Sequence, residues 1–298
     1  MIVSKPLSLE DLPLFRSCAA AADSRNAWLS FGIPYLWDGP EGQNLLLLDG
    51  RVAVEWLLTE HSPFFTFPIG SGDLRTAVLA IRDYAAAKGC PLVFRYVDEE
   101  CRAALDSALP GCFDFTENRD EADYLYEAVA LSTLTGRKLH AKRNYCNRFE
   151  AAHSWRSVPM DPSLFPGCRE ILVRWAEGRE DSAVEKAAVE RAFDEWEALP
   201  LEGCVLLAEG EAAAFALGEK LNSDTFVVHF EKALGELPGA YPMICREFAR
   251  QILTVYPEIR YINREEDMGL PNLRKAKEEW RPCALLKKYV AVWKGNGE

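Results

Sequence analysis

Hydrophobic and polar residues follow the same order of patterns in the two halves of the chain. The first half is predicted to contain a hairpin, a third strand, a helix with an apolar stripe, a further strand, a short helix and two closing strands. These elements cover Asn44–Thr59, Phe64–Ile69, Leu74–Ala85, Pro91–Val97, Asp98–Ala108, and Phe113–Phe115 with Tyr124–Ala130. A helix towards Ala22 precedes them, because Ser8 and Asp11 have the spacing of a capping box.

The second half repeats this order after two helices, Phe165–Glu177 and Ser182–Ala198. The expected elements are a hairpin at Cys204–Lys220, a strand at Thr225–Phe230, a helix with Tyr241, Cys245, Phe248 and Ile252 on one side, a strand at Arg260–Asn263, a helix at Leu270–Glu279 and a strand at Leu285–Trp293. We therefore predict an α/β or α+β fold used in tandem, with units at residues 1–133 and 134–298. One long irregular domain is the alternative.

The junction of the two halves carries concentrated positive charge. Five cations and no acid lie between Arg137 and Arg148, in a protein whose formal net charge is −12. Such an island attracts an anionic group, so the stretch is a candidate surface for an anionic donor, whereas a solvated linker helix is the alternative. Its candidate contact residues are Arg137, Lys138, His140, Lys142, Arg143 and Asn147. The stretch is expected to be largely helical, with Leu134, Leu139, Tyr145, Cys146 and Phe149 more buried than the cations.

Composition excludes several classes of protein. The nine cysteines form no C-x-x-C pair and the four histidines have no metal-ligand spacing, so no metal site is expected. No apolar run is long enough to span a membrane, and the acidic start of the sequence does not resemble a secretion signal. Scattered cysteines fit a reducing compartment, so we expect a cytoplasmic protein without a membrane span.

Acid–base chemistry is predicted at the third strand of the second half. His229 and Glu231 alternate with apolar residues and are expected to project from one face, where either could take a proton from an incoming amine. Gly235 and Gly239 lie in the loop before the next helix, whose start favours anions. Tyr241 at that helix start could donate a proton to a leaving group, although a packing role is the alternative.

The strand after this helix ends in a polar run that is a second candidate for binding substrate. Strand ends that lead into helices place ligand groups in α/β folds, which indicates Asn263, Arg264 and Asp267. Arg274 and Lys277 are three residues apart and share a helix face, where they could hold a phosphate or carboxylate or pair with neighbouring acids.

Three stretches resemble a bacterial family of largely uncharacterised proteins related to the C-terminal catalytic domain of phosphatidylglycerol lysyltransferase. They are DYLY at 123–126, LSTLTGRKLHAKRNYCNRF at 131–149 and YINREEDMGLPNLRKAKEEWRP at 261–282. The family is more distantly similar to Fem-type peptidoglycan aminoacyltransferases. The resemblance implies two tandem units of the GNAT N-acyltransferase fold.

The same resemblance implies transfer of an acyl or aminoacyl group to an amine or hydroxyl. Aminoacyl-tRNA is then the expected donor, and an acyl-coenzyme A-dependent N-acetyltransferase is the alternative. A non-catalytic binding module on the same fold is a third. Coenzyme A users of the fold carry a (Gln/Arg)-x-x-Gly-x-(Gly/Ala) loop, and Leu234–Ala240 contains glycines without matching this motif.

Overall fold

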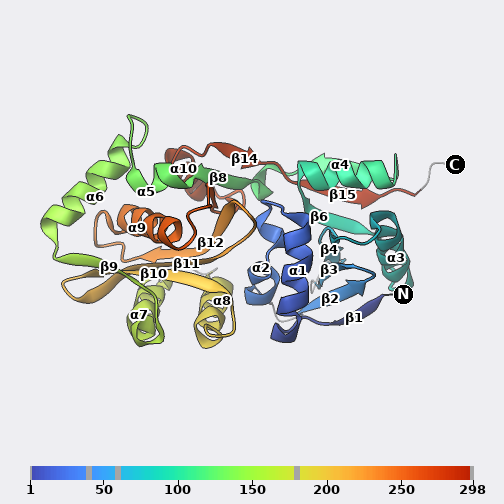
Figure 1. Ribbon diagram of the computed structural model, residues 1–298, viewed down its shortest axis with the longest axis horizontal. Helices are drawn as coiled ribbons and strands as arrows, with labels where there is room; N and C mark the ends of the chain where they lie inside the picture. The colour runs from blue at the N-terminus through green and yellow to red at the C-terminus, as the bar shows by residue number, and fades with distance from the viewer. Residues whose placement is uncertain (1, 38–41, 58–61, 178–181, 296–298) are drawn as a thin grey trace. The chain divides into compact units, whose positions relative to one another are not determined.

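The computed structural model describes residues 2–37, 42–57, 62–177 and 182–295. The chain divides into two compact units (Figure 1). Unit 1 comprises Met1–Asp123, Glu266–Leu270 and Leu285–Glu298, and unit 2 comprises Tyr124–Glu265 and Pro271–Ala284. Leu58 and Thr59, the end of the predicted first hairpin, lie outside the described residues.

The first helical segment of unit 1 starts after Ser8, as the sequence predicted. The Asp11 carboxylate accepts a hydrogen bond from the backbone N–H of Ser8 at 3.1 Å, which forms the expected capping box. The elements of the unit are β1 (Val3–Pro6), α1 (Leu12–Ala22), a 3₁₀ turn (Ala27–Leu29), α2 (Gly32–Leu36), β2 (Gln43–Leu48), β3 (Arg51–Trp56), β4 (Phe64–Phe65), β5 (Ile69–Gly70), α3 (Leu74–Ala87), β6 (Val93–Val97), α4 (Glu99–Ala108), β7 (Phe113–Glu117) and β15 (Tyr289–Trp293).

Unit 2 repeats the order of elements with longer central strands. Its elements are β8 (Asp123–Glu127), α5 (Ala128–Thr133), α6 (His140–Ala152), β9 (Trp155–Pro159), α7 (Phe165–Ala176), α8 (Ser182–Asp194), β10 (Leu201–Ala208), β11 (Glu211–Lys220), β12 (Thr225–Ala233), α9 (Ala240–Val255), β13 (Tyr261–Asn263), α10 (Pro271–Glu279) and β14 (Ala284–Leu286). The expected mixed fold with two sheets and flanking helices is therefore confirmed.

Each sheet includes one strand from the other half of the sequence. Sheet A has the order β1-β2-β3-β4-β6-β15-β7, with β5 beside β3, and sheet B has the order β9-β10-β11-β12-β13-β8-β14. β15 is antiparallel to both β6 and β7, and β8 is antiparallel to β13. The strand that follows β7 along the chain thus joins sheet B, and the strand that follows β14 joins sheet A.

Because the two sheets exchange a strand, the observed division of the chain differs from the predicted one. We predicted a boundary between residues 133 and 134, whereas the units divide at Asp123 and the last strand returns to unit 1. Tyr124–Ala130 was predicted to close the first sheet, but β8 belongs to sheet B. The alternation of apolar residues specifies a half-buried strand and does not specify which sheet it enters.

Helices cover both faces of sheet B. In Figure 1, α9 lies on one face and α7 and α8 lie on the other. Phe248 of α9 packs edge-on against Phe226 of β12, and Phe193 of α8 packs against Phe215 of β11. The two faces of sheet B therefore pack against different helices.

Candidate functional site

His229 is an extra residue in the ladder between β11 and β12. Phe230 pairs with Leu217 and Val228 pairs with Gly218, which leaves His229 between them as a β-bulge. Beyond a bulge, side chains point to the face opposite to the one that regular alternation predicts. The sequence alone could not show this, because a bulge adds a residue without changing composition.

The bulge places His229 and Glu231 on opposite faces of sheet B. Glu231 lies on the α9 face, where Cys245 of α9 hydrogen-bonds to it. His229 contacts Glu219, which alternates with Phe215 on the face covered by α8. The prediction that His229 and Glu231 project together is therefore wrong.

His229 is held between two carboxylates. Its Nδ1 lies 2.8 Å from Oε1 of Glu265 and its Nε2 lies 3.2 Å from Oε1 of Glu219, with the imidazole completely buried. Burial alone would lower the pKa of His229, but the hydrogen bonds and charges of the two glutamates outweigh it and raise the pKa to about 9. The raised pKa favours an imidazolium that donates to both acids at neutral pH.

The sequence prediction selected neither Glu219 nor Glu265 of this group, although Glu265 lies in the polar run after the predicted strand. Its φ of 55° is left-handed, which costs a non-glycine residue about 1–3 kcal/mol unless the surroundings impose it. The side chain of Asn263 accepts from its N–H at 2.7 Å, and its carbonyl accepts from Tyr124 N–H at 3.1 Å and from Lys277 Nζ at 3.2 Å. A carboxylate held this firmly against a buried imidazolium is a pre-oriented group, about one-sixth exposed.

On the other face, Glu231 is engaged in a buried ion pair. Its Oε1 lies 2.8 Å from Arg264 Nη2, and both side chains are nearly buried. The Arg264 guanidinium lies over the rings of Tyr126 and Trp280. Burial raises the pKa of Glu231 and the positive charge of Arg264 opposes this rise. Arg264 Nη1 is buried and has no hydrogen-bond partner among the described residues.

The loop before α9 is packed against α6. Gly239 has a φ of 99°, and a Cβ at this position would lie 2.7 Å from the backbone oxygen of Tyr145. A Cβ at Gly235 would meet nothing within 4 Å. The close approach that Gly239 permits is therefore to a neighbouring helix. Tyr241, in the first turn of α9, is 37% exposed, whereas Cys245 on the same predicted stripe is buried.

The basic stretch divides into exposed and engaged cations. Arg137 and Lys138 precede α6, and with His140, Asn147 and Arg148 they are exposed. Arg143 instead donates to the carbonyl of Leu134 at 2.6 Å and to that of Gly136 at 3.2 Å, and Lys142 pairs with Glu279 at 3.0 Å.

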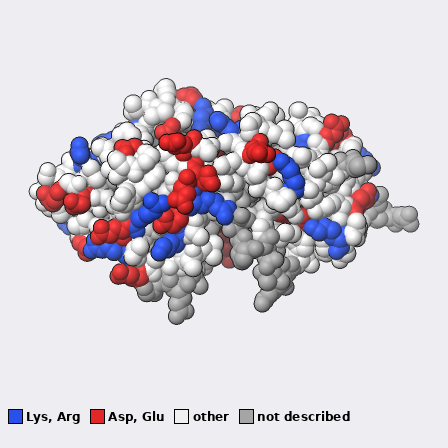
Figure 2. Space-filling model, turned by 90° about the horizontal axis from the view of Figure 1, so that it is seen from below, with Lys and Arg blue, Asp and Glu red and all other residues white. Residues whose placement is uncertain are grey.

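Burial of the apolar residues follows the prediction with one exception. Leu134, Leu139, Cys146 and Phe149 are buried, but Tyr145 is 48% exposed. On the face of unit 2 that α7 and α8 cover, acidic and basic side chains are interspersed, as for Arg169 with Glu190 and Asp194 (Figure 2). The segment 137–148, which has five cations and no acid, therefore differs in charge from that face.

The candidate binding residues at the end of β13 and beyond it lie in different environments. Asn263 is fully buried and shapes the turn at Glu265. Asp267 belongs to unit 1, where it pairs with Arg119 at 3.1 Å. Lys277 donates to the carbonyls of Arg264 and Glu265, so its ammonium group holds the strand end rather than forming a clamp with the partly buried Arg274.

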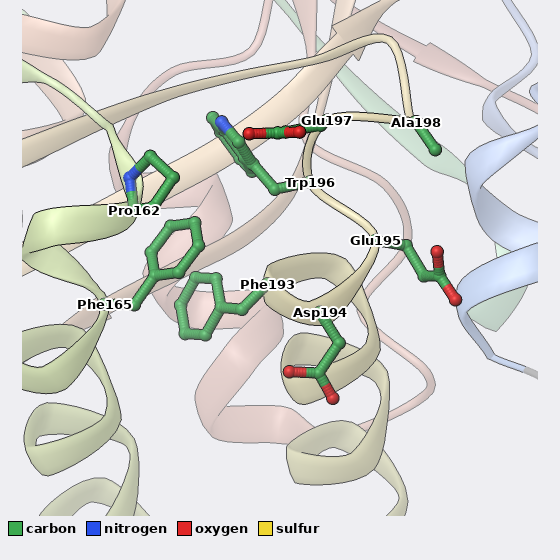
Figure 3. A pocket seen from close by; sticks show the side chains of 8 residues that line it. All are labelled: Pro162, Phe165, Phe193, Asp194, Glu195, Trp196, Glu197 and Ala198. Atoms are coloured by element: carbon green, nitrogen blue, oxygen red, sulfur yellow. The ribbon is translucent and has the colours of Figure 1, made fainter.

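A cavity of about 300 Å³ lies elsewhere in unit 2, at the end of α8 (Figure 3). Its lining residues are Pro162, Phe165, Phe193, Asp194, Glu195, Trp196, Glu197 and Ala198. The rings of Phe165 and Phe193 stack on each other with centroids 4.7 Å apart. None of the predicted site residues lines this cavity. Among the described residues, no group of three histidine, cysteine or acidic side chains is placed to hold a metal ion.

The duplicated sheet order defines a tandem protein of the GNAT-type N-acyltransferase fold. The chain belongs to the family described as phosphatidylglycerol lysyltransferase, C-terminal, whose model matches residues 36–292. The resemblance drawn from residues 123–126, 131–149 and 261–282 is thereby confirmed.

Solved structures share this fold. A conserved protein of unknown function from Bacteroides thetaiotaomicron VPI-5482 is 34% identical, with a TM-score of 0.92 over 99% of this chain and 100% of that one. The C-terminal domain of a putative lysylphosphatidylglycerol synthetase from Agrobacterium fabrum shares the fold at 14% identity, with a TM-score of 0.69 over 97% and 93% of the two chains.

A tandem GNAT protein from the clavulanic acid biosynthesis pathway shares the fold at 12% identity, with a TM-score of 0.53 over 98% of both chains. Comparison with curated proteins gives no match. Within the described residues, no helix combines the length and apolarity needed to cross a membrane.

Proposed function

We propose that the chain transfers an aminoacyl group from aminoacyl-tRNA to an amine or hydroxyl acceptor. Membership of the lysyltransferase family supports aminoacyl transfer as the reaction class. We assign the chemistry to the Glu265 carboxylate, because this group is fixed in a left-handed turn and is oriented by the buried His229.

In this mechanism Glu265 is the general base and His229 is a positioning residue. The acceptor nitrogen or oxygen attacks the ester carbonyl carbon of the donor, and the bond from that carbon to the ribose oxygen breaks. Glu265 takes the proton of the acceptor and returns it to the departing ribose oxygen. The hydrogen bond from His229 holds the Glu265 carboxylate in place, and no covalent intermediate on the protein is needed.

The exposed cations before and along α6 supply the contact for tRNA. Arg137, Lys138, His140 and Arg148 are exposed, whereas Lys142 and Arg143 are engaged within unit 2. Neutralising phosphates releases counterions, so tRNA binding is expected to weaken steeply with salt. Asn147 adds an exposed polar group to this surface.

Acyl-coenzyme A is the alternative donor, and the loop at Gly235 and Gly239 does not favour it. The space beside Gly239 is filled by the backbone of α6 rather than left for a pyrophosphate. Tyr241 and Arg274 stay candidate contacts for either donor, because both are partly accessible.

The test measures loss of labelled amino acid from total aminoacyl-tRNA, with acceptors from both chemical classes. The acceptors are lysine, a polyamine, glycerol phosphate and phosphatidylglycerol vesicles, and acetyl-coenzyme A is assayed as the second donor. The proposal expects acceptor-dependent release from aminoacyl-tRNA that Glu265→Gln lowers by roughly a hundredfold. Glu211→Gln, at an exposed carboxylate in the same unit, is the matched control.

Donor binding is tested separately by changing three exposed cations, Arg137, Lys138 and Arg148, to glutamine. The proposal expects weaker tRNA binding and a salt dependence reduced by about 2–3 in log–log slope. Changing Arg16, Lys287 and Lys294 of unit 1 to glutamine gives the same net charge and is expected to leave binding unchanged. Activity with acetyl-coenzyme A but none with aminoacyl-tRNA would contradict the proposed donor.

A further inference from the structure

The cavity at the end of α8 is separate from the residues proposed for the transfer reaction. All eight residues that line it belong to unit 2, and His229, Glu231 and Glu265 are not among them. Its volume of about 300 Å³ is at the lower end of the range of small-molecule sites. The cavity therefore has the size for one small organic ligand.

Three aromatic rings form a wall of this cavity. Phe165 begins α7, Phe193 lies in the last turn of α8, and Trp196 lies in the turn that follows α8. Phe165 stacks on Phe193, and Trp196 meets Phe165 edge-on with centroids 5.8 Å apart. Phe165 and Phe193 are buried, whereas Trp196 is partly exposed. The wall is thus anchored in the core and accessible from solvent at Trp196.

The indole of Trp196 is held in place by packing against β10. A Cβ at Gly203 would lie 2.9 Å from Cη2 of Trp196 and 2.8 Å from Cβ of Met160. The glycine therefore leaves the space that the indole occupies. Because the ring is already fixed by its neighbours, little side-chain freedom is lost when a ligand contacts it.

The charge of the cavity is negative. Its lining includes Asp194, Glu195 and Glu197 and no lysine or arginine among the described residues. Asp194 pairs with Arg169 at 2.8 Å, but neither glutamate forms a side-chain hydrogen bond or ion pair with a described residue. Figure 3 shows the Glu197 side chain extending toward the indole of Trp196. Two carboxylates without a cation therefore accompany the aromatic wall.

A cation of the chain already uses the same kind of surface. The Arg169 guanidinium lies 5.5 Å from the ring centroid of Phe193 and pairs with Asp194. Faces of aromatic rings attract cations, and tryptophan does so most strongly. The two unpaired glutamates flank Trp196 in the sequence, so they offer a ring and carboxylates for which the chain supplies no cation.

We propose that this cavity binds small organic ammonium ions that carry a hydrocarbon body, such as arylalkylamines. The hydrocarbon body contacts the aromatic wall, and Glu195 and Glu197 balance the charge of the ammonium group beside Trp196. A neutral ligand of the same shape loses the charge interaction, and an anion is repelled. The inference does not rest on the proposed transfer reaction, because binding needs neither a donor nor Glu265.

The experiment titrates the full chain by calorimetry with phenethylamine, 2-phenylethanol and 3-phenylpropionate. These three compounds keep the phenyl ring and change the charge from positive to neutral to negative, and ethylamine keeps the charge without the ring. The proposal expects saturable binding of phenethylamine, at least about fivefold weaker binding of the alcohol and no binding of the anion. Ethylamine is expected to bind at least about tenfold more weakly than phenethylamine, because the apolar contact is lost.

The site is located by a double variant, Glu195→Gln with Glu197→Gln, which keeps the shape of both side chains and removes their charge. It is expected to weaken phenethylamine binding about five- to tenfold and to leave binding of 2-phenylethanol unchanged. The matched control is Glu127→Gln with Glu211→Gln, which removes the same charge at two exposed positions of unit 2. Melting curves check that both double variants fold as the parent protein does.

Two results would overturn the proposal. The first is absence of phenethylamine binding to the parent protein, or equal affinity for the amine and the alcohol. The second is equal affinity of the two double variants for phenethylamine, since the bound amine would then lie elsewhere. Neither result bears on Glu265, whose role is tested by transfer rates.

Discussion

The fourth strands of the two sheets differ more in length than any other corresponding pair of strands. β4 of unit 1 has two residues, Phe64–Phe65, whereas β12 of unit 2 has nine, Thr225–Ala233. Both strands are parallel to the fifth strand of their sheet. The long strand has room for a bulge that carries His229, while the short strand contributes only aromatic side chains.

The fifth strands, in contrast, share a left-handed residue close to their ends, Tyr96 within β6 and Glu265 two residues after β13. Tyr96 and Glu265 occupy the same left-handed position after an arginine. Tyr96 stacks on Trp28, and Glu265 accepts from His229. The same backbone conformation thus supports aromatic packing in unit 1 and an oriented carboxylate in unit 2. This difference is the reason why we propose the reaction chemistry for unit 2.

The largest effect on stability is expected at Lys288, the buried residue that anchors β15 in sheet A. Lys288 is fully buried and donates to Asp123 at 2.9 Å and to Asn26 at 2.6 Å. Lys288→Met leaves the buried Asp123 without this cation and is expected to lower the free energy of unfolding by about 3–5 kcal/mol. The neighbouring Lys287 is about half exposed, so Lys287→Met is expected to change the free energy of unfolding far less.

Denaturant unfolding of the two variants measures this difference. Equal stability of Lys288→Met and Lys287→Met would mean that the buried pair does not hold β15 in sheet A.

The comparison of the two left-handed residues is sharpened by changing each one conservatively. Glu265→Gln is expected to lower aminoacyl transfer by about a hundredfold, or about 2.7 kcal/mol in activation free energy, because the amide cannot accept the proton. Tyr96→Phe keeps the ring in unit 1 and is expected to leave the rate within about twofold. Steady-state rates with parallel melting curves check both.

Similar rates for Glu265→Gln and the parent protein would remove Glu265 from the mechanism. A large loss with Tyr96→Phe would place part of the chemistry in unit 1.

Much of the fold, but little of the site, could be predicted from the sequence. Apolar periodicity located the hairpins and helices, and the Ser8–Asp11 spacing located a capping box. The exchange of β8 and β15 was missed because it depends on which sheet completes its pairing, which is not a local property. Glu265 was missed because its importance depends on a left-handed φ and on the bulge at His229, and neither changes the pattern of residue types.

Tyr145 shows the limit of assigning burial by residue type. It was grouped with the buried residues of the basic stretch, yet its side chain is half exposed while its backbone oxygen faces Gly239. The neighbouring Cys146 and Phe149 take the inward positions of α6. The contact of α6 with the loop before α9 includes the backbone oxygen of Tyr145, and a side-chain pattern does not reveal this part of it.

A smaller effect is expected for the pH dependence of stability that His229 confers on the chain. The pKa of His229 is raised from 6.5 to about 9 in the folded chain. Its stabilising contribution is therefore complete below about pH 6.5 and is lost as the pH rises through about 9, at no more than about 1.4 kcal/mol per pH unit. His229→Gln is expected to be less stable at pH 6.5 and to lose this slope. Urea midpoints between pH 6 and 10 measure it, with the exposed His140→Gln as control.

The smallest effects are expected at the helices that follow the fourth strands, which begin differently in the two units. α3 is capped by Asp73, which accepts from Thr76 N–H at 2.7 Å, so Asp73→Ala is expected to lower the melting temperature by loss of this cap. α9 has Gly239 at its cap with a left-handed φ and α6 in contact, so Gly239→Ala is expected to cost about 1–2 kcal/mol by backbone strain. Gly235→Ala, with open space around it, is expected to change stability by less than about 0.5 kcal/mol. Thermal unfolding of the three variants ranks these costs. If Gly235→Ala abolished donor binding at unchanged stability, the loop would hold the donor after all, and the packing of Gly239 against α6 would not be its main role.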